Sequence, residues 1–383
     1  MEKLKDTRFS SLFILIFFLN FFFFVSHASL NMLPPYLSSI GATKGYIGFF
    51  MNINSLVLVF FVVIFGRFTS RIDQKKALFI GYLLFFISII SMFYFFDNLI
   101  MLLILRFVAA ISFSFGYTMH SNIIFDIIPK EKRASSFALF GISGVMSNPV
   151  GSFIGELIIK RYHSKYLFIL SAIFSAITII LVLFIKHKQK FQEFKEYLSF
   201  FDIIKRRQLL YLIVMALIFG GTFGIFASFI PNFSKERLGV ANLSMFFIPF
   251  SIIIIFVRIF FSNLLDKHKK ENIIFFSLFC MLAPMVGILF LSSKYQLLLM
   301  GGFYGISHGL LFPTLSTAFV NSGKESEKII LNNTFITVNT FGIVFFSTIL
   351  GFVGDIFTTI SIFITMSVLI FVLIVISLFK KKY

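Results

Sequence analysis

The sequence predicts an all-α membrane protein of twelve transmembrane helices in two six-helix halves. Three observations support this fold class: the composition, the recurrence of long apolar runs, and a repeat of landmarks in the second half. Of the 383 residues, 58% are hydrophobic and only 13% are charged. Soluble domains average roughly 45–50% apolar and about 25% charged residues, so the chain departs from a soluble domain in both respects.

The apolar runs have the length that a membrane-crossing helix needs. A helix rises about 1.5 Å per residue, so about 20 apolar residues cross a hydrocarbon core about 30 Å thick. Runs such as 246–257 do not alternate between apolar and polar residues, which argues against barrel strands. The predicted spans lie at 12–33, 46–66, 77–96, 99–120, 134–158, 166–185, 209–230, 243–265, 272–292, 295–318, 328–353 and 356–379.

The second half of the chain repeats landmarks of the first. Aligning Pro35 with Pro231 brings Arg71 opposite Lys267 at the same offset. We therefore expect an N-terminal half at 1–186, a cytoplasmic linker at 187–208 and a C-terminal half at 209–383. Two similar six-span halves are typical of secondary transporters, whose substrate binds near the membrane midplane between them.

The linker is expected to lie on the membrane surface. Its apolar residues from Phe191 to Ile204 recur at spacings near 3.6, which predicts an amphipathic helix.

Charge predicts the orientation. Most of the 34 lysines and arginines fall in segments that face the cytoplasm if the N-terminus is inside, and the loop at 160–165 is the main exception. The positive-inside rule then places both termini in the cytoplasm, and enrichment in Phe, Ile, Lys and Asn suggests the cytoplasmic membrane of a bacterium. The net charge of +18 is explained by loops that face anionic lipid, so no nucleic-acid partner is expected.

No cofactor or metal site is predicted. The single cysteine, Cys280, excludes an intrachain disulfide and a multi-cysteine metal site. No phosphate-binding glycine loop, zinc helix or nucleophile elbow is present, so the chain is not expected to be an enzyme.

The first span carries polar residues on one face. Asn20, His27 and Asn31 align on a helix, while phenylalanines cover the other faces. A lone histidine in a membrane helix is often only a packing group, and that alternative stays open for His27 and for His308.

The fourth span begins a second stripe at Arg106, which continues through Ala110, Phe113, Tyr117 and His120. An arginine inside a span costs about 2.5–3.5 kcal/mol on insertion scales, so it should face a wet cavity or a partner. Arg106 either snorkels to the outer surface in a structural role, or contacts an anionic substrate or takes part in proton coupling.

Polar residues recur in the C-terminal half. Tyr304 and His308 lie four residues apart, and Asn332 and Asn339 lie seven apart, so each pair shares a helix face. No Asp or Glu falls in mid-membrane, so proton coupling would depend on His27, His308 or Glu156, or on the substrate itself.

The loop GRFTSRIDQK at 66–75 resembles a motif of the major facilitator superfamily, G-x-L-A-D-R-x-G-R-K. Gly66, Arg71 and Lys75 match, while the motif's aspartate is replaced by Ser70. In the family this motif ties the two halves together on the cytoplasmic side, a role that Asp73 would have to supply here. The second copy, at 262–271, keeps Asp266 and Lys267.

Two further segments carry the resemblance, which extends over essentially the whole chain. Arg106 matches a family arginine in span 4, and the stretch with Gly144, Pro149 and Gly151 resembles the family's antiporter motif, although Asn148 replaces a glycine. Ordinary helix packing explains such glycines as well. The resemblance also implies that span 1 borders a central cavity, lined by the polar residues named above.

The sequence therefore predicts a monomeric secondary transporter in a lipid bilayer, working by alternating access. We expect proton-coupled efflux of a small organic solute. Import or uniport of a nutrient or metabolite is the first alternative. A non-transporting receptor or scaffold with the same fold is the second.

Overall fold

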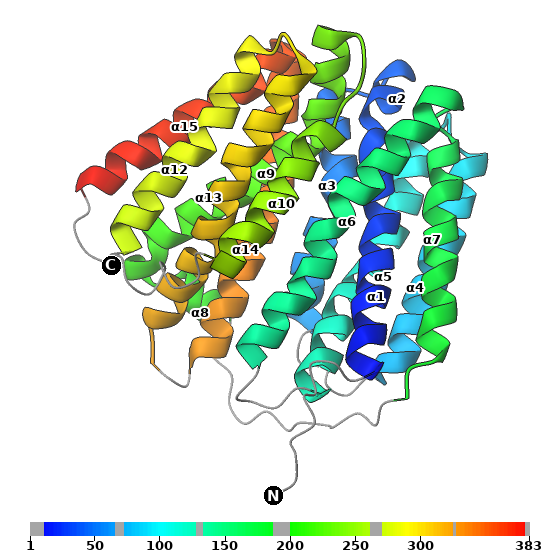
Figure 1. Cartoon of the computed structure of the whole chain (residues 1–383), viewed down its shortest axis with the longest axis horizontal. Helices are drawn as coiled ribbons and strands as arrows, with labels where there is room; N and C mark the ends of the chain where they lie inside the picture. The colour runs from blue at the N-terminus through cyan, green and yellow to red at the C-terminus, as the bar shows by residue number, and fades with distance from the viewer. Residues whose placement is uncertain are drawn as a thin grey trace, which may run out of the picture. The chain divides into compact units, whose positions relative to one another are not determined.

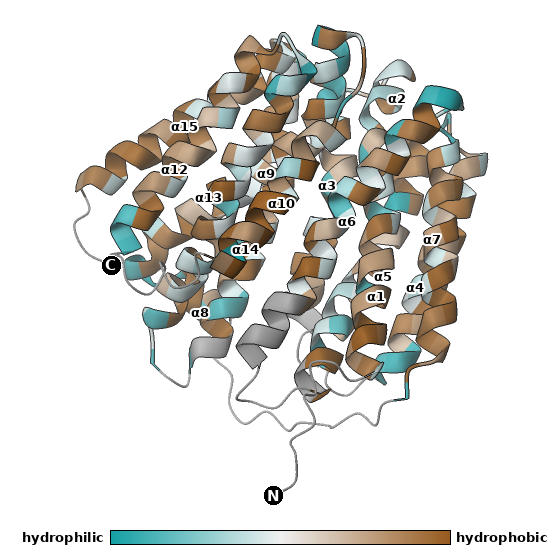
Figure 2. Cartoon of the chain, viewed as in Figure 1, coloured by the Kyte–Doolittle hydropathy of each residue, from teal (hydrophilic) through white to brown (hydrophobic). Residues whose placement is uncertain are grey.

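The structure is a computed structural model that describes residues 11–65, 73–127, 133–186, 200–260, 270–324 and 327–379. Within these ranges every regular element is a helix (Figure 1). Eleven described helices are long and apolar enough to cross a membrane, and a shorter apolar helix spans Ser244–Phe260. Hydrophobic residues dominate these helices along their length (Figure 2). The predicted fold class, an all-α membrane protein, is confirmed.

The helices group into two compact units. The first comprises Met1–Leu33 and Val57–Phe194, and the second comprises Pro34–Leu56 and Lys195–Tyr383. The division passes through one helix, α3 (Lys44–Phe60), which is followed directly by a π-helical turn, η3 (Phe61–Phe65).

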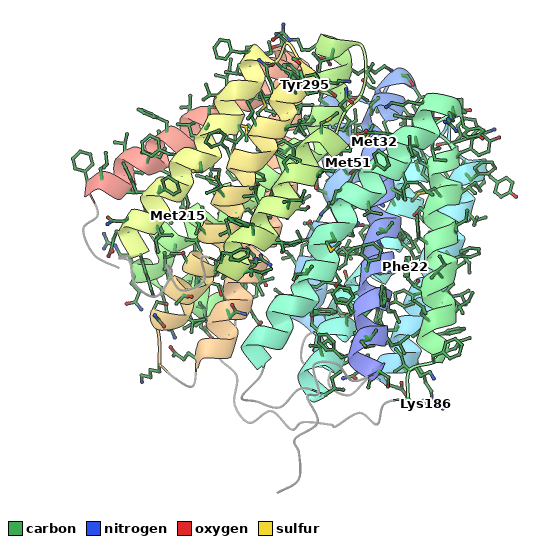
Figure 3. All side chains as sticks on the ribbon, in the orientation of Figure 1. Phe22, Met32, Met51, Lys186, Met215 and Tyr295 are labelled. Carbon is green, nitrogen blue, oxygen red and sulfur yellow. The ribbon has the colours of Figure 1, made fainter. Side chains whose placement is uncertain are left out.

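In the first unit, α1 packs against α5, α6 and α7, and α4 packs against α5 and α7. Aromatic contacts fill these interfaces: Phe22 of α1 (Figure 3) stacks on Phe174 of α7 at a centroid distance of 6.1 Å. The elements of this unit are α1 (Ser11–Ala28), η2 (Ser29–Met32), η3, α4 (Gln74–Tyr94), α5 (Leu99–Ile127), α6 (Arg133–Arg161) and α7 (Tyr166–Leu183).

In the second unit, α9 packs against α14, and α13 packs against α10 and α12. The elements are α2 (Pro34–Ser39), most of α3, α8 (Phe200–Ile204), η6 (Arg207–Leu209), α9 (Leu210–Leu238), α10 (Ser244–Phe260), α12 (Lys270–Gly287), η7 (Ile288–Phe290), α13 (Lys294–Asn321), α14 (Lys328–Ile356) and α15 (Thr359–Phe379).

Local sequence explains where several helices begin and end. The side chains of Asp73, Asn98 and Ser293 accept hydrogen bonds from backbone N–H groups in the first turns of α4, α5 and α13. Such caps satisfy donors that have no partner within the helix. At the end of α9, Gly239 adopts φ 73°, a left-handed conformation that glycine reaches without a Cβ penalty.

The first predicted span differs in detail. The sequence predicts one run over 12–33, whereas α1 ends at Ala28, a 3-10 turn follows, and α2 begins at Pro34. Proline has no N–H and fits the first turn of a new helix better than the interior of an old one. For the linker helix expected from Phe191 to Ile204, the structure describes only the end, α8, and the rest lies outside the described residues.

Candidate functional site

Among the described helices of the first unit, α5 buries an arginine. Arg106 of α5 is only 2% exposed, although its guanidinium is charged. It interacts electrostatically with His27 of α1, the histidine of the predicted polar stripe. A charged side chain inside a membrane helix is costly and is a functional-site candidate by default, so Arg106 and His27 form the centre of the candidate site.

The hydrogen bonding of His27 fixes its tautomer. Its Nδ1 lies 2.8 Å from the backbone oxygen of Phe23. A carbonyl only accepts, so Nδ1 carries the hydrogen, and Nε2 of the neutral ring is an acceptor. This Nε2 is buried and has no hydrogen-bond partner within the part of the chain that the structure describes. His27 therefore presents one bare lone pair.

Aromatic rings enclose His27. Phe85 stacks on the imidazole at a centroid distance of 4.2 Å, while Phe23 and Phe113 lie at 4.6 and 4.7 Å. Phe113 is only partly buried and stacks on Tyr117, which is also partly buried, at 6.0 Å. The enclosure therefore has an accessible edge along α5, formed by Phe113 and Tyr117.

Asn20 belongs to a separate, self-contained network. Asn20 donates to Ser143 of α6 at 2.7 Å, and Ser143 donates to the backbone oxygen of Phe140 at 2.6 Å. The oxygen of Asn20 accepts from Nδ1 of His120 at 2.9 Å, which leaves Nε2 of His120 to accept from the hydroxyl of Tyr82. This network joins α1, α4, α5 and α6, so Asn20 is hydrogen-bonded inside the unit, and its predicted place in a substrate cavity stays a prediction.

The other predicted residues of the first unit lie at helix crossings. Asn31 is partly exposed in the turn η2. A Cβ at Gly151 would stand 2.8 Å from the backbone carbon of Ala28, so only glycine lets α6 approach α1 so closely there. A Cβ at Gly144 would meet only ordinary contacts at 3.8 Å, and Pro149 lies inside α6.

In the second unit, two of the predicted residues lie in an aromatic cluster. Tyr304 is fully buried, and its hydroxyl donates to Thr222 at 2.8 Å, because the Thr222 hydroxyl already donates to a backbone oxygen. His308 lies against Phe219 at 4.9 Å and Phe250 at 5.3 Å. Its Nδ1 has no hydrogen-bond partner among the described residues.

The two predicted asparagines of α14 serve different contacts. Asn332 accepts a hydrogen bond from Ser316 of α13 at 2.6 Å. The backbone oxygen of Asn339, in α14, lies close to α9. A Cβ added at Gly220 of α9 would stand 1.9 Å from this oxygen. These positions join helices within the unit, and their predicted contact with a substrate stays a prediction.

Two of the six residues predicted to form cytoplasmic gates lie within the described part of the chain. Asp73 caps its own helix α4, and the amine of Lys75 donates to the backbone oxygens of Leu183 and Ile185 at 2.8 and 2.9 Å. Cations at a helix C-terminus are stabilising, so Lys75 ties the start of α4 to the end of α7. Gly66, Arg71, Asp266 and Lys267 lie outside the described residues.

Three polar residues were missed or undervalued in the sequence. His120 was assigned to the α5 stripe but not to the site, and Tyr82 was not singled out. Asn52 of α3, in the stretch MNINS, donates to the hydroxyls of Ser228 and Ser347 at 2.7 and 3.0 Å. The signal that could have found Asn52 is its polarity inside an apolar span.

The described side chains form no group of three or more His, Cys, Asp or Glu that could hold a metal ion. What the first unit offers instead is a fixed cation, a bare imidazole lone pair and part-exposed aromatic rings. Such groups bind a small molecule by charge, by one hydrogen bond and by stacking.

Comparison with known proteins identifies the family. The sequence model of the Major Facilitator Superfamily matches residues 13–327. An uncharacterized transporter of Buchnera aphidicola subsp. Acyrthosiphon pisum is 27% identical over 290 residues, which cover 70% of each chain. A second, from Buchnera aphidicola subsp. Schizaphis graminum, is 25% identical over 160 residues, 41% of this chain and 39% of that protein.

Solved transporter structures share the fold. The nucleoside transporter NupG aligns with a TM-score of 0.82 at 15% identity, covering 97% of this chain and 100% of NupG. A POT family transporter in complex with a thioalcohol-conjugated peptide aligns with a TM-score of 0.79 at 14% identity, covering 96% of this chain and 95% of that one. At these identities the likeness concerns the fold alone.

Proposed function

The chain belongs to the Major Facilitator Superfamily, a family of membrane transporters rather than enzymes, and we propose that it exports a small organic solute in exchange for protons by alternating access. The observation that carries the proposal is the bare Nε2 lone pair of His27. One lone pair holds either a proton or a hydrogen bond from a solute, but not both. Solute and proton therefore compete for His27, and competition for one group produces exchange.

Arg106 gives the site its charge preference. The guanidinium is buried and interacts electrostatically with His27, so its positive charge favours a solute that brings an acceptor or a negative charge. The rings of Phe113 and Tyr117 add an apolar, flat surface next to this cation. We infer a small amphipathic solute that carries both a hydrogen-bond donor, for His27, and an acceptor or anionic group, for Arg106.

The experiment is solid-supported-membrane electrometry on proteoliposomes, scanning a compound panel with and without a pH gradient. Nucleosides and 5-aminolevulinic acid belong in the panel, since structures with this fold include a nucleoside transporter and a transporter bound to 5-aminolevulinic acid. We expect currents for one compound class that grow with the gradient. A parallel flux assay with labelled solute detects electroneutral exchange.

Two substitutions test the roles separately. Arg106→Met should weaken the apparent solute affinity about tenfold or more, because a hydrogen bond to a charged group contributes about 1.5–3 kcal/mol and each 1.4 kcal/mol is tenfold. His27→Phe keeps the ring but removes the lone pair, so pH-driven flux should be lost. Arg258 lies in the last turn of α10 in the second unit, so Arg258→Met is the matched control for removing a membrane cation.

The alternatives give different results. Solute flux that ignores the pH gradient and survives His27→Phe indicates uniport, and flux in which solute and protons move together indicates import by symport. Neither result is compatible with exchange at His27. Absence of binding and flux across the panel, in protein with a normal melting transition, favours the receptor alternative.

A further inference from the structure

The helix α3 is divided between the two units. Its first part, through Leu56, belongs to the second unit, and the chain from Val57 onward belongs to the first. A helix shared in this way must either bend or lose contacts when the two units move relative to each other. The contacts that hold its first part are therefore of special interest.

The first turn of α3 is capped by a residue more than three hundred positions away. The carboxylate of Asp355, near the end of α14, accepts from the backbone N–H groups of Lys44 at 2.6 Å and Gly45 at 2.8 Å. The amine of Lys44 donates to the backbone oxygen of Gly354 at 3.0 Å. The next two amides of α3 are satisfied locally by Thr43.

The first amides of α3 therefore have two kinds of acceptor: Asp355 of α14 and Thr43 of the preceding loop. A helix leaves its first four N–H groups without partners, and a carboxylate near them also interacts favourably with the helix dipole. In α3 half of those donors depend on a neighbouring helix rather than on the preceding loop. When α3 leaves α14, the amides of Lys44 and Gly45 lose their acceptor, so Asp355 favours the attached state.

The two turns of α3 that follow this cap are closely packed against α14 and α9. A Cβ at Gly48 would stand 2.1 Å from the backbone oxygen of Ser347, so the backbones of α3 and α14 meet there. One turn further along, Asn52 donates to the hydroxyls of Ser228 and Ser347. The attachment therefore extends from the cap through about two turns of α3.

The other end of α3 is built differently. The α-helix passes into the π-helical turn η3 at Phe61, within a few residues of the division between the units. A π-helical turn interrupts the regular hydrogen-bond ladder, and such interruptions are sites where helices bend.

We propose that Asp355 is a positioning residue that clamps the first part of α3 to α14, and that α3 swings about η3 when this clamp opens during transport. The proposal requires alternating access but neither the proton exchange nor the role of His27. Opening breaks the two charge-assisted hydrogen bonds to Asp355 and the two hydrogen bonds of Asn52, and it exposes the face of α9 that carries Ser228.

The test measures access to that face. Ser228 is fully buried, so Ser228→Cys in a Cys280→Ala background reacts with a membrane-impermeant maleimide only when α3 moves away. Labelling of whole cells and of inside-out vesicles covers both sides of the membrane. We expect Asp355→Ala to raise the labelling rate about fivefold to tenfold, and Asp355→Asn, which keeps one acceptor, to raise it less.

Hydrogen exchange provides the second measurement. The amides of α3's first turn should exchange faster in Asp355→Ala, while those of α13 stay unchanged. Glu236→Ala, which removes a carboxylate of α9 that accepts from Thr359, is the matched control and should change neither measurement.

Two results would overturn the proposal. The first is labelling and exchange in Asp355→Ala that match the parent protein. The second is an equal rise in labelling at Ser277→Cys, a fully buried position on α12, because this indicates general loosening. Neither measurement uses solute or a pH gradient, so a failure of proton exchange leaves this test intact.

Discussion

The helices α1 and α9 occupy corresponding positions in the two halves of the sequence, yet they hold their neighbours by different means. Aligning Pro35 with Pro231 places Asn20 of α1 opposite Ala216 and places Phe24 opposite Gly220. The repeat therefore preserves the positions of helices while replacing the residues that join them.

In the first unit, α1 uses polar side chains. Asn20 bridges to α5 through His120 and to α6 through Ser143, at 2.9 and 2.7 Å. Each of these groups has a set donor or acceptor role, so one substitution leaves two partners unsatisfied. The attachment is directional, and it depends on the protonation of a histidine.

In the second unit, α9 uses glycines. A Cβ at Gly220 or Gly224 would stand 1.9 or 2.4 Å from a backbone oxygen of α14, and one at Gly342 would stand 2.1 Å from a backbone oxygen of α9. Close backbone approach of this kind has no titratable part. The contacts of α1 therefore include a titratable histidine, whereas α9 and α14 meet through close backbone approach.

The largest effect on stability is expected from adding a side chain at Gly220, where the backbones of α9 and α14 approach closely. Gly220→Ala places a methyl group against the backbone oxygen of Asn339, which cannot rotate away as a side chain could. We expect the free energy of unfolding to fall by about 3 kcal/mol or more. The buried thiol of Cys280, the single cysteine, reports unfolding through its reaction with a fluorogenic maleimide in detergent.

The control for this prediction is Gly302→Ala. A Cβ at Gly302 of α13 would meet nothing within 4 Å, so this substitution should be neutral or stabilise the helix by up to about 1 kcal/mol. Equal stability of the Gly220 and Gly302 variants would contradict the view that α9 depends on close backbone approach.

The sequence predicts the helices well and their contacts poorly. Apolar run length located the spans because hydrophobic thickness acts on each helix separately. The stripe from Arg106 to His120 correctly placed both residues on α5, but periodicity gives the face of a helix and not its neighbour. That His120 binds Asn20, or that Asp355 caps α3, depends on packing between segments that lie one hundred or more residues apart. For the candidate site, periodicity therefore predicts which residues share a helix face but not which residues they contact.

A smaller effect is expected in the polar network of the first unit. Asn20→Ala and His120→Phe each remove a partner from a buried group, at about 1–3 kcal/mol apiece. Because the two share one hydrogen bond, the double variant should be more stable than the sum of the single effects predicts, by about 1 kcal/mol. The same Cys280 assay measures all four proteins.

Tyr304→Phe, which removes a single hydroxyl in the second unit, is the control for this test of additivity. Its effect should add to that of Asn20→Ala within about 0.5 kcal/mol, since the two residues belong to different units and Tyr304 binds Thr222 of its own unit. If the effects of Asn20→Ala and His120→Phe also add, the network is a set of independent contacts. The contrast between the polar contacts of α1 and the close backbone approach of α9 would then have no basis.

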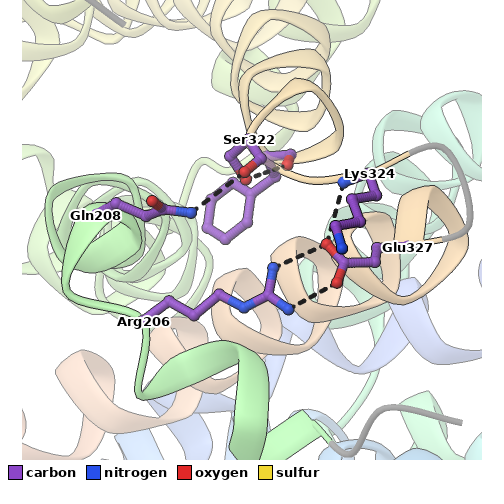
Figure 4. Close-up of polar contacts among 6 residues, drawn as sticks. Arg206, Gln208, Ser322, Lys324 and Glu327 are labelled. Atoms are coloured by element: carbon purple, nitrogen blue, oxygen red, sulfur yellow. Dashed lines mark hydrogen bonds and ion pairs between the residues drawn. The ribbon is translucent and has the colours of Figure 1, made fainter.

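The smallest effect concerns a titratable contact of the second unit that lies outside the membrane spans. The Arg206 guanidinium donates to both carboxylate oxygens of Glu327 at 2.9 and 2.8 Å, and the Lys324 backbone N–H donates at 3.1 Å (Figure 4). Arg206, followed by the Lys324 amide, lowers the pKa of Glu327 from 4.5 to about 2. The contact joins the segment before α9 to the start of α14.

Because the pKa of Glu327 is lower in the folded state, its stabilising effect is fully present above about pH 4.5 and is lost as the pH falls toward about 2. Glu327→Gln should therefore melt slightly below the parent at pH 6, and the gap should close between pH 4.5 and 2. Circular dichroism at low salt measures both curves, and high salt should reduce the gap, since the pair is partly exposed. A gap that persists at pH 2 would mean that Glu327 acts through packing, and that the second unit has no acid-sensitive contact at this position.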